Sequence, residues 1–200
     1  MILAMSSVSA DHILDLFRGS GALLEGHFRL TSGLHSSGYL QCALVLQHPR
    51  EAGICGAALA DRVRSLGVQV VLSPAIGGIV IGQEVGRALG VRAIFAERQD
   101  GALSLRRGFT LSPGEKVFVV EDVVTTGGST KETIDVARAA GAEVVAAGSI
   151  IDRSGGQQRI DVPYHALAVV TLPTYQPESC PLCLAGRPVV KPGSRAIQIS

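Results

Sequence analysis

The sequence predicts an α/β domain in which helices flank a central parallel sheet, with a small N-terminal flap. Short apolar segments alternate along the chain with amphipathic segments of helical spacing. The apolar segments are continuous, which is typical of strands buried on both faces of a sheet. Helical crossovers make neighbouring strands parallel. The 200 residues suffice for one domain, so we expect residues 1–200 to form a single unit.

The first third of the chain predicts a helix, the flap and a second helix. Asp11 is a candidate N-cap for a helix that ends near residues 19–21. Residues 26–41 mix apolar side chains with glycine, serine and histidine, which indicates short strands and a turn that form the flap. Pro49 suits the first turn of a further amphipathic helix, which Gly67 ends.

From residue 68 onward, strands and helices alternate. The predicted strands are 68–72, 91–96, 116–120 and 144–151, and the predicted helices are 80–89 and 131–140. Residues 97–108 are too polar for a core element and longer than an ordinary connection, which favours a functional or mobile loop. We expect residues 176–200 to form a C-terminal extension.

Composition and charge exclude several classes of protein. Hydrophobic residues make up 46% of the chain and charged residues 18%, which excludes an intrinsically disordered segment. The net charge is +1 and aromatic residues make up 4%, so we expect no nucleic-acid partner. We find no secretion signal and no apolar run long enough to span a membrane, so we expect a cytoplasmic protein with no membrane partner.

The most informative segment is residues 119–131. Glu121 and Asp122 follow a predicted buried strand, at the edge of the sheet where α/β proteins bind ligands. The polar loop Thr125–Ser129 then leads into a helix, so backbone N–H groups, hydroxyls and the helix dipole converge on a phosphate. Acceptors for sugar hydroxyls beside a phosphate site match a ribose 5-phosphate. In the alternative interpretation, the acids cap the strand end and the glycines make an ordinary turn.

Other phosphate-binding motifs fit this segment less well. A Walker loop is excluded because Gly-x-x-x-x-Gly-Lys is missing. A dinucleotide fold is disfavoured because no Gly-x-Gly-x-x-Gly follows a strand and the acids precede the glycines. A second glycine pair follows another predicted strand in the loop Ser73–Gly78. This loop either faces the same ligand or forms a plain turn between strand and helix.

Several segments resemble a known family. Glu121–Ser129 resembles the phosphoribosyl pyrophosphate (PRPP) loop of type I phosphoribosyltransferases. Gly26–Gly33 resembles the N-terminal flap of orotate phosphoribosyltransferases, and Ile151–Arg153 resembles the segment where that family contacts the orotate carboxylate. The likeness covers most of the chain, including residues 190–195. The resemblance implies a homodimer that uses Mg²⁺ to transfer ribose 5-phosphate from PRPP to N1 of orotate, giving orotidine 5′-monophosphate and pyrophosphate in pyrimidine biosynthesis.

The resemblance also implies roles for individual residues. Asp122 and Arg98 are the candidate catalytic residues, and Thr125 and Arg153 are the candidates for binding orotate. The candidate PRPP-binding residues are Glu121, Asp122, Val123, Val124, Thr125, Thr126, Gly127, Gly128 and Ser129. The candidates for binding pyrophosphate are Ser73, Gly77, Gly78, Arg106 and Arg107. Mg²⁺ prefers phosphate oxygens and water, so we expect it to be bound through PRPP, with no dedicated protein ligand.

The sequence departs from the family pattern at its cations. The resemblance implies lysines and a histidine in the loop over pyrophosphate, but residues 97–108 offer only Arg98, Arg106 and Arg107 as cations. Gly77 and Thr31 stand where the resemblance implies further lysines. Arginine binds pyrophosphate but is a poor proton donor, so these residues do not identify a general acid.

Two alternative functions stay open at this stage. One is a phosphoribosyltransferase for a purine or another pyrimidine, and the other is a PRPP-binding regulator without catalytic activity. The flap and Arg153 speak against the first, because a guanidinium matches the carboxylate that orotate has and a purine lacks. Arg153 could instead pair with Asp152, with Asp161 or with solvent.

The four cysteines, Cys42, Cys55, Cys180 and Cys183, indicate reduced thiols. The Cys180-x-x-Cys183 pair is also open to a metal or a redox interpretation. A structural metal site needs about four ligands, and we find one such pair, with His165 as the nearest histidine. We therefore favour two reduced thiols in a C-terminal loop. The remaining histidines are interpreted as surface or packing residues: His12, His27, His35 and His48.

Overall fold

Strands and helices alternate within residues 8–30 and 32–191, which the computed structural model describes. The strands are β1 (Leu23–Arg29), β2 (His35–Leu40), β3 (Val70–Pro74), β4 (Arg92–Gln99), β5 (Ala102–Leu105), β6 (Lys116–Val124), β7 (Glu143–Asp152), β8 (Tyr164–Val169) and β9 (Thr174–Tyr175). The α-helices are α1 (Ala10–Gly19), α2 (Ala43–Leu46), α3 (Pro49–Val63), α4 (Gly78–Leu89), α5 (Gly128–Ala139) and α6 (Pro181–Leu184). Short 3₁₀ helices are η1 (Arg64–Leu66) and η2 (Pro177–Ser179).

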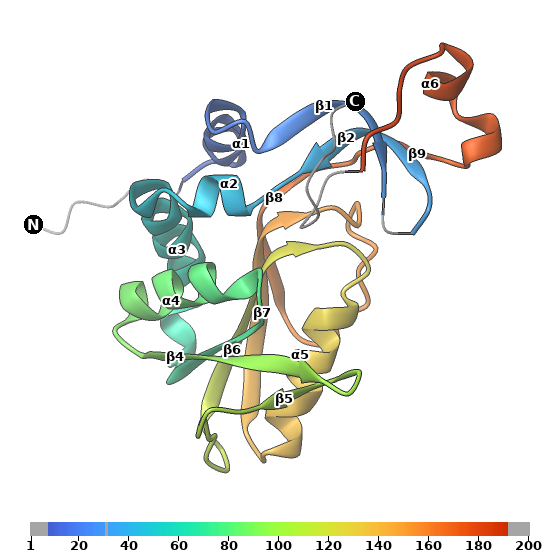
Figure 1. The fold of residues 1–200 in the computed structure, drawn as a ribbon. Coiled ribbons are helices and arrows are strands. Elements are labelled where there is room, and N and C mark those ends of the chain that lie inside the picture. The colour runs from blue at the N-terminus through green and yellow to red at the C-terminus, as the bar shows by residue number, and fades with distance from the viewer. Residues whose placement is uncertain (1–7, 31, 192–200) are drawn as a thin grey trace, which may run out of the picture.

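The main sheet has the strand order β5-β4-β3-β6-β7-β8, and a smaller sheet has the order β1-β2-β9. All neighbours in the main sheet are parallel except β4 and β5. Figure 1 shows the smaller sheet beyond one end of the main sheet, with α6 beside it. The predicted fold class, a central parallel sheet flanked by helices with an N-terminal flap, is therefore confirmed.

Side chains along the central strands alternate between two apolar cores, as the pleat of a strand requires. One core contains Val71, Phe118 and Val120 together with Leu59 of α3 and Ile81 and Val85 of α4. The other contains Val70, Leu72, Val117 and Val119 together with Ile134 and Ala137 of α5. Burial on both faces explains why these strands are continuously apolar in sequence.

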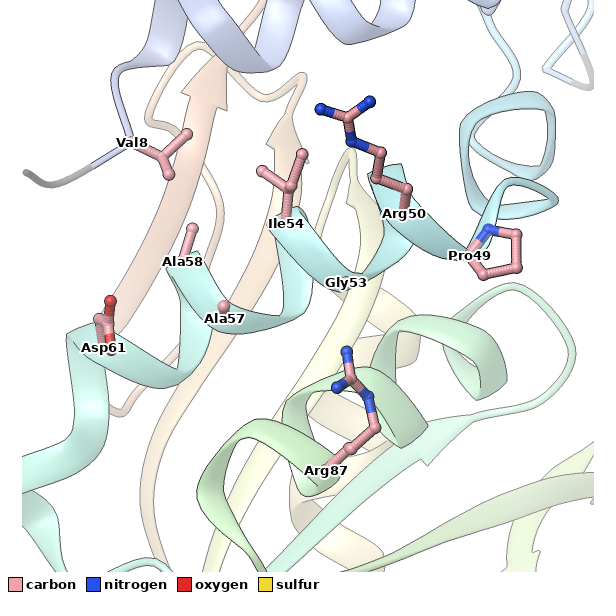
Figure 2. A pocket seen from close by; sticks show the side chains of 9 residues that line it. All are labelled: Val8, Pro49, Arg50, Gly53, Ile54, Ala57, Ala58, Asp61 and Arg87. Carbon is pink, nitrogen blue, oxygen red and sulfur yellow. The ribbon is translucent and has the colours of Figure 1, made fainter. Parts of the chain in front are cut away.

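Glycines allow α3 and α4 to pack closely on one face of the sheet. A Cβ on Gly56 would lie 2.6 Å from Cβ of Glu84, and a Cβ on Gly53 would lie 2.9 Å from Nη2 of Arg87. Figure 2 shows Arg87 of α4 reaching toward α3 beside Gly53. A side chain at Gly56 would displace α4, because backbone atoms of Glu84 also lie within 3.0 Å of the added carbon.

The expectation of a loop over residues 97–108 is wrong in its secondary structure. Strand β4 continues to Gln99, and β5 returns antiparallel to it, with Arg98 opposite Leu103. Asp100 and Gly101 join the two strands with φ of 51° and 89°. Positive φ at both residues suits the twist of a two-residue hairpin, and the Asp-Gly pair was its sequence signal. Leu103 is buried, so a mostly polar segment still contributes to the core.

Two predicted boundaries also move. Ser9 caps α1, because its Oγ accepts a hydrogen bond from the His12 amide at 3.2 Å, and Asp11 lies inside the first turn. Strand β6 extends to Val124, so Glu121 and Asp122 lie within the strand. The extension follows from pairing with the long β7, in which Glu121 lies opposite Ser149 and Val124 opposite Asp152.

The flap, defined here as the β1–β2 hairpin, also holds the C-terminal segment. His35 of β2 lies opposite Tyr175 of β9. On the other side, the Val190 amide donates to the His27 carbonyl, and the Arg29 amide donates to the Val190 carbonyl, both at 2.8 Å. Thr31 and residues 192–200, which the flap and extension predictions include, lie outside the described residues. No described helix combines the length and apolarity that a bilayer crossing requires.

Candidate active site

The carboxyl ends of β3 and β6 meet at the centre of the main sheet. These strands are parallel neighbours, with Leu72 opposite Val119. The chain leaves β3 into α4, which packs in one core, and leaves β6 into α5, which packs in the other. Figure 1 shows these two helices on opposite sides of the sheet. Such a divergence at the carboxyl ends of strands is where open α/β sheets bind ligands.

The side chains of Glu121 and Asp122 point to opposite faces of the sheet at the end of β6. Thr130 of α5 donates a hydrogen bond from Oγ1 to Oε2 of Glu121 at 3.3 Å. Asp122 faces the start of α4, where a Cβ on Gly77 would lie 2.8 Å from its Oδ1. Consecutive strand residues point to opposite faces, which explains the difference. Among the described residues, neither acid forms an ion pair.

Burial makes both acids weaker than usual. Burial and the neighbouring Asp122 charge raise the pKa of Glu121 to about 8, against the opposing hydrogen bond from Thr130. Burial also raises the pKa of Asp122, although hydrogen bonds from the Val123 amide, at 2.8 Å, and from the Cys42 thiol oppose the change. Two adjacent half-buried carboxyls without a cation among the described residues are costly, so this site is suited to a ligand that brings hydroxyl donors or positive charge.

The loop after β6 has the features of an anion site. Thr125, Thr126, Gly128 and Ser129 are exposed. Gly127 has φ of +82°, a conformation that favours glycine, and no side chain caps the N-terminus of α5. The first-turn amides and the helix dipole can therefore act on an anion. Val124 is buried and Val123 is half-buried, so these two contribute backbone to the site more than side chain.

The loop after β3 packs directly on the end of β6. A Cβ on Gly78 would lie 3.1 Å from the Val120 carbonyl oxygen, and one on Gly77 would strike Asp122 as described above. Ser73 lies beneath this loop, because its side chain is 1% exposed and its Oγ faces Gly82 of α4. Within the described chain, this Oγ has no hydrogen-bond partner. Glycines at 77 and 78 are therefore needed for two loops to share one site.

Arg153 reaches the same edge from the end of β7. Its amide donates to the Val124 carbonyl at 2.8 Å, which aligns it with the loop after β6. The guanidinium is partly buried, which lowers its pKa, and the described residues give its Nε no hydrogen-bond partner. Asp152 instead accepts a hydrogen bond from the Ser154 amide at 2.6 Å, and Asp161 pairs with Arg138 at 2.7 Å. The alternative in which Arg153 pairs with either aspartate is therefore wrong.

The three arginines of residues 97–108, called the β4–β5 segment below, differ in their ion-pair partners. Arg98 pairs with Glu132 of α5 at 2.6 Å, and Arg107 pairs with Glu97 at 2.7 Å. Arg106 is exposed and forms no ion pair with a described residue. Arg98 and Arg107 are themselves about half exposed, so their ion pairs are weak enough to exchange for another anion.

Sequence reasoning missed two site neighbours, Tyr39 and Cys42. Both are close enough to Arg153 to affect its pKa. Cys42 is also close enough to Asp122 to lower the pKa of that carboxyl, and burial raises the pKa of the thiol. Neither residue has a local motif, since they come from β2 and the residue before α2 and meet Asp122 and Arg153 only in the folded chain.

The structure also changes the interpretation of the Cys-x-x-Cys pair. Cys180 and Cys183 lie with His27 and His35, and one ligand atom from each of the four falls within 4.8 Å of the others. His165, on β8, is not part of this group. The inference that too few ligands are available is therefore wrong. His27 and His35 are buried, as packing residues are, but the sequence separates them from the cysteines by more than 140 positions.

The site at the carboxyl ends of β3 and β6, with Arg153 beside it, is called the strand-end site below. A hollow along α3 is not part of it. It encloses about 330 Å³, and Figure 2 shows its lining: Val8, Pro49, Arg50, Gly53, Ile54, Ala57, Ala58, Asp61 and Arg87. Arg87 is engaged by Glu84 at 2.5 Å. No residue of the strand-end site lines this hollow.

The acid pair, the glycine loop and the helix N-terminus at the central strand ends are the arrangement that the resemblance to phosphoribosyltransferases implies. The family model described as phosphoribosyl transferase domain matches residues 43–173. The orotate phosphoribosyltransferase of Desulforamulus reducens is 53% identical over 190 residues, covering 95% of this chain and all of that protein. The chain therefore belongs to the phosphoribosyltransferases and, within them, to the orotate phosphoribosyltransferase family.

Solved structures agree with this assignment. The orotate phosphoribosyltransferase of Aeropyrum pernix is 26% identical, with a TM-score of 0.65 and coverage of 79% of this chain and 93% of that one. The Mycobacterium tuberculosis orotate phosphoribosyltransferase in complex with PRPP is 20% identical, with a TM-score of 0.57 and coverage of 66% and 80%. At this lower identity, the likeness shows that the two chains share a fold.

Proposed function

We propose that this chain transfers ribose 5-phosphate from PRPP to N1 of orotate, giving orotidine 5′-monophosphate and pyrophosphate in the synthesis of UMP. The observation that carries the proposal is the meeting of three groups at one sheet edge. These are the acids Glu121 and Asp122, the glycine loop at α5, and the guanidinium of Arg153; within the described residues, neither the acids nor the guanidinium forms an ion pair. Together they match a sugar with two hydroxyls, a phosphate and a planar carboxylate.

The β6–α5 segment binds the ribose 5-phosphate in this proposal. Glu121 and Asp122 accept hydrogen bonds from the 2′ and 3′ hydroxyls, which favours their ionised forms. The 5′-phosphate lies against the amides and hydroxyls of the loop Thr125–Ser129, at the positive end of α5. The glycine pair Gly77-Gly78 faces the pyrophosphate from the other side, with Ser73 supporting the loop from below.

Mg²⁺ fits the residues of this site. The Glu121 and Asp122 oxygens have no cationic partner among the described residues, and Gly77 leaves open the space beside Asp122 that a Cβ would fill. Mg²⁺ prefers carboxylate, phosphate and water oxygens, so these acids would hold it through water or through the PRPP hydroxyls. When bound with PRPP, the ion supplies positive charge that offsets the charge of pyrophosphate.

Arg153 and Thr125 bind orotate in this proposal, with the flap closing over the base. The guanidinium fork can form two parallel hydrogen bonds to a carboxylate. Its partial burial makes such a bond stronger than one at the surface. Tyr39, on the flap strand β2, is the neighbour through which flap position and base binding would be coupled.

Positioning and electrostatics supply the catalysis. As the N1–C1′ bond forms, the C1′–O bond to pyrophosphate breaks and the electron pair leaves with pyrophosphate. The N1 proton passes to an oxygen of the departing pyrophosphate, directly or through water. Positive charge that develops on the sugar is stabilised by Asp122 and Glu121. Charge on the leaving group is stabilised by Arg98, with Arg106 or Arg107. Arg106 is already free of a described partner, whereas Arg98 must leave Glu132 as the β4–β5 segment moves.

We further propose a cytoplasmic homodimer in which Arg98 or Arg106 acts on the partner's pyrophosphate. Ile76, 85% exposed, and Val80, 44% exposed, place apolar surface next to the pyrophosphate loop, which supports an interface there. None of the four cysteines forms a disulfide, which supports a reducing compartment. Light scattering should give a mass of twice the chain's 20.8 kDa.

Mixing two inactive variants tests the shared site. In a heterodimer of the Arg106→Ala and Asp122→Asn variants, one site receives the intact Asp122 of the first variant and the intact Arg106 of the second. The other site receives both substituted residues. An equimolar mixture should therefore regain about one quarter of wild-type activity after subunit exchange. If the dimer forms and the mixture stays as inactive as its components, each site is built within one protomer.

Turnover tests the function itself. Protein, PRPP, Mg²⁺ and orotate are combined, and the loss of orotate absorbance is followed. Asp122→Asn should lower kcat by at least about 100-fold, because it removes charge that stabilises the transition state. Adenine, hypoxanthine or uracil in place of orotate should give no product. Tight PRPP binding without turnover on any base would identify a regulator and overturn the proposal.

A further inference from the structure

We propose that His27, His35, Cys180 and Cys183 bind a structural Zn²⁺ that fastens the C-terminal segment to the flap. These four residues are called the Cys–His cluster below. They come from β1, from β2 and from the segment that begins α6. One donor atom of each lies within 4.8 Å of all the others. The cluster is independent of the strand-end site and of the reaction proposed there.

The donor separations match a tetrahedral site. Bonds of about 2.3 Å to sulfur and about 2.0 Å to nitrogen imply tetrahedral edges of about 3.6 Å between S and N. The observed distances are 3.5 Å from Cys180 Sγ to His27 Nε2, 3.7 Å from Cys183 Sγ to His27 Nε2, and 3.3 Å from Cys183 Sγ to His35 Nδ1. The two nitrogens are 2.9 Å apart and need to separate by about 0.4 Å to share a metal.

The hydrogen bonding of His27 prepares it as a ligand. Its Nδ1 lies 2.8 Å from the backbone carbonyl oxygen of Arg187. A carbonyl only accepts hydrogen bonds, so Nδ1 carries the proton. The lone pair of Nε2 is then free to bind a metal ion placed between the four ligand atoms. A metal-bound histidine typically donates its second N–H to a carbonyl or carboxylate in this way.

The donor types and their enclosure favour Zn²⁺ in a structural role. Two thiolates and two imidazoles suit zinc, whereas Mg²⁺ and Ca²⁺ require oxygen ligands. Four protein ligands complete the tetrahedron and leave no open position for substrate. His27, His35 and Cys180 are buried, and Cys183 closes the site from the exposed side. The Cys-x-x-Cys spacing is one that structural zinc sites use.

The position of the Cys–His cluster explains what the metal would stabilise. The C-terminal segment pairs with β2 through β9 and with β1 through Val190, and the cluster lies between these two contacts along the chain. Figure 1 shows α6 and β9 beside the β1–β2 hairpin. Strand β9 has two residues, so its pairing with β2 is weak by itself. A metal ion bound by residues of both the flap and the C-terminal segment would stabilise this pairing, because it joins segments that are far apart in the sequence.

Metal analysis of the purified wild-type protein is the first test. After dialysis against metal-free buffer, mass spectrometry should find about one zinc per chain. Protein unfolded and refolded with Co²⁺ alone should absorb between about 600 and 750 nm, with an intense band that reports thiolate bonds, as a tetrahedral site with sulfur ligands requires. No zinc in the purified protein, together with no such Co²⁺ spectrum, would overturn the proposal.

Matched variants locate the site. Cys183→Ser and His35→Gln should lose the zinc and the Co²⁺ spectrum, whereas the controls Cys55→Ala and His12→Gln should keep one zinc per chain. If a cluster variant fails to fold, wild-type protein stripped by a chelator replaces it. Stripping should lower the melting temperature by at least about 5 °C and speed hydrogen exchange at residues 174–190. Zinc retained by both cluster variants, or a melting temperature and hydrogen exchange that do not change when the wild type is stripped under reducing conditions, refutes the assignment.

Discussion

We expect the free energy of unfolding of the wild type to fall as the pH rises from 5 to 9. Replacing Glu121 with glutamine should remove much of this fall. In the folded chain, burial and Asp122 raise the pKa of Glu121 to about 8, against a reference value of 4.5. Between these values the folded state keeps a proton that the unfolded state releases. This contribution to stability is complete below pH 4.5 and is lost as the pH rises through about 8.

The size of the effect follows from the two pKa values. Their separation, at about 1.4 kcal/mol per pH unit, corresponds to about 5 kcal/mol of free energy of unfolding. Glutamine stays neutral and keeps an oxygen that accepts the Thr130 hydrogen bond, so it preserves the contact without the titration. The variant should therefore match the wild type near pH 5 and exceed its stability by several kcal/mol at pH 9.

Urea unfolding at intervals from pH 5 to pH 9, without PRPP or Mg²⁺, measures this difference. Glu143→Gln is the matched control, because Glu143 is an exposed carboxylate at the start of β7 and should follow the wild-type curve. Wild-type and Glu121→Gln curves that run parallel within about 1 kcal/mol over this range would show that Glu121 is not protonated in the folded protein.

Three further substitutions test other parts of the site. Gly77→Ala should weaken PRPP binding at least about tenfold in titration calorimetry, because the new Cβ meets Asp122. The control Gly19→Ala adds a Cβ that meets nothing within 4 Å and should bind PRPP as the wild type does; equal affinities for the two variants would contradict the packing argument. Arg153→Lys should raise the KM for orotate by about 10- to 100-fold in steady-state assays and leave the KM for PRPP unchanged, because lysine keeps the charge but cannot form two parallel hydrogen bonds to a carboxylate. An unchanged KM for orotate would exclude Arg153 from that contact. Ser73→Ala should leave the free energy of unfolding in urea unchanged or raise it by up to about 1 kcal/mol, because the buried hydroxyl has no described partner, and a clear loss would reveal a hydrogen bond.

Local patterns in the sequence were enough to predict the layers of the fold. Continuous apolar strands and helices ended by glycines reflect burial on both faces and backbone conformation, which are properties of neighbouring residues. Gly67 and Gly90, for example, end helical segments with φ of 69° and 73°. The acid pair before a glycine loop is equally local, so the sequence alone was enough to select the β6–α5 segment as a candidate site.

The hairpin at residues 97–108 shows where local patterns were insufficient. Its polar composition indicated a loop, but its backbone groups pair across β4 and β5, and Leu103 reaches the core beside α5. Arg98 likewise looked like a free cation and is held by Glu132, which belongs to a helix further along the chain. A side chain's partner depends on the packing of whole elements, which its own neighbours in sequence do not specify.

The sequence by itself determined the α/β class, the family resemblance and the position of the candidate phosphate loop, because each depends on a short run of residues. Only the tertiary structure decided that Gly77 lies against Asp122 and that no described residue forms an ion pair with Arg153. It alone brought His27 and His35 to Cys180 and Cys183. These contacts join segments up to about 150 residues apart, and they exist because strand pairing and core packing carry distant segments to one place.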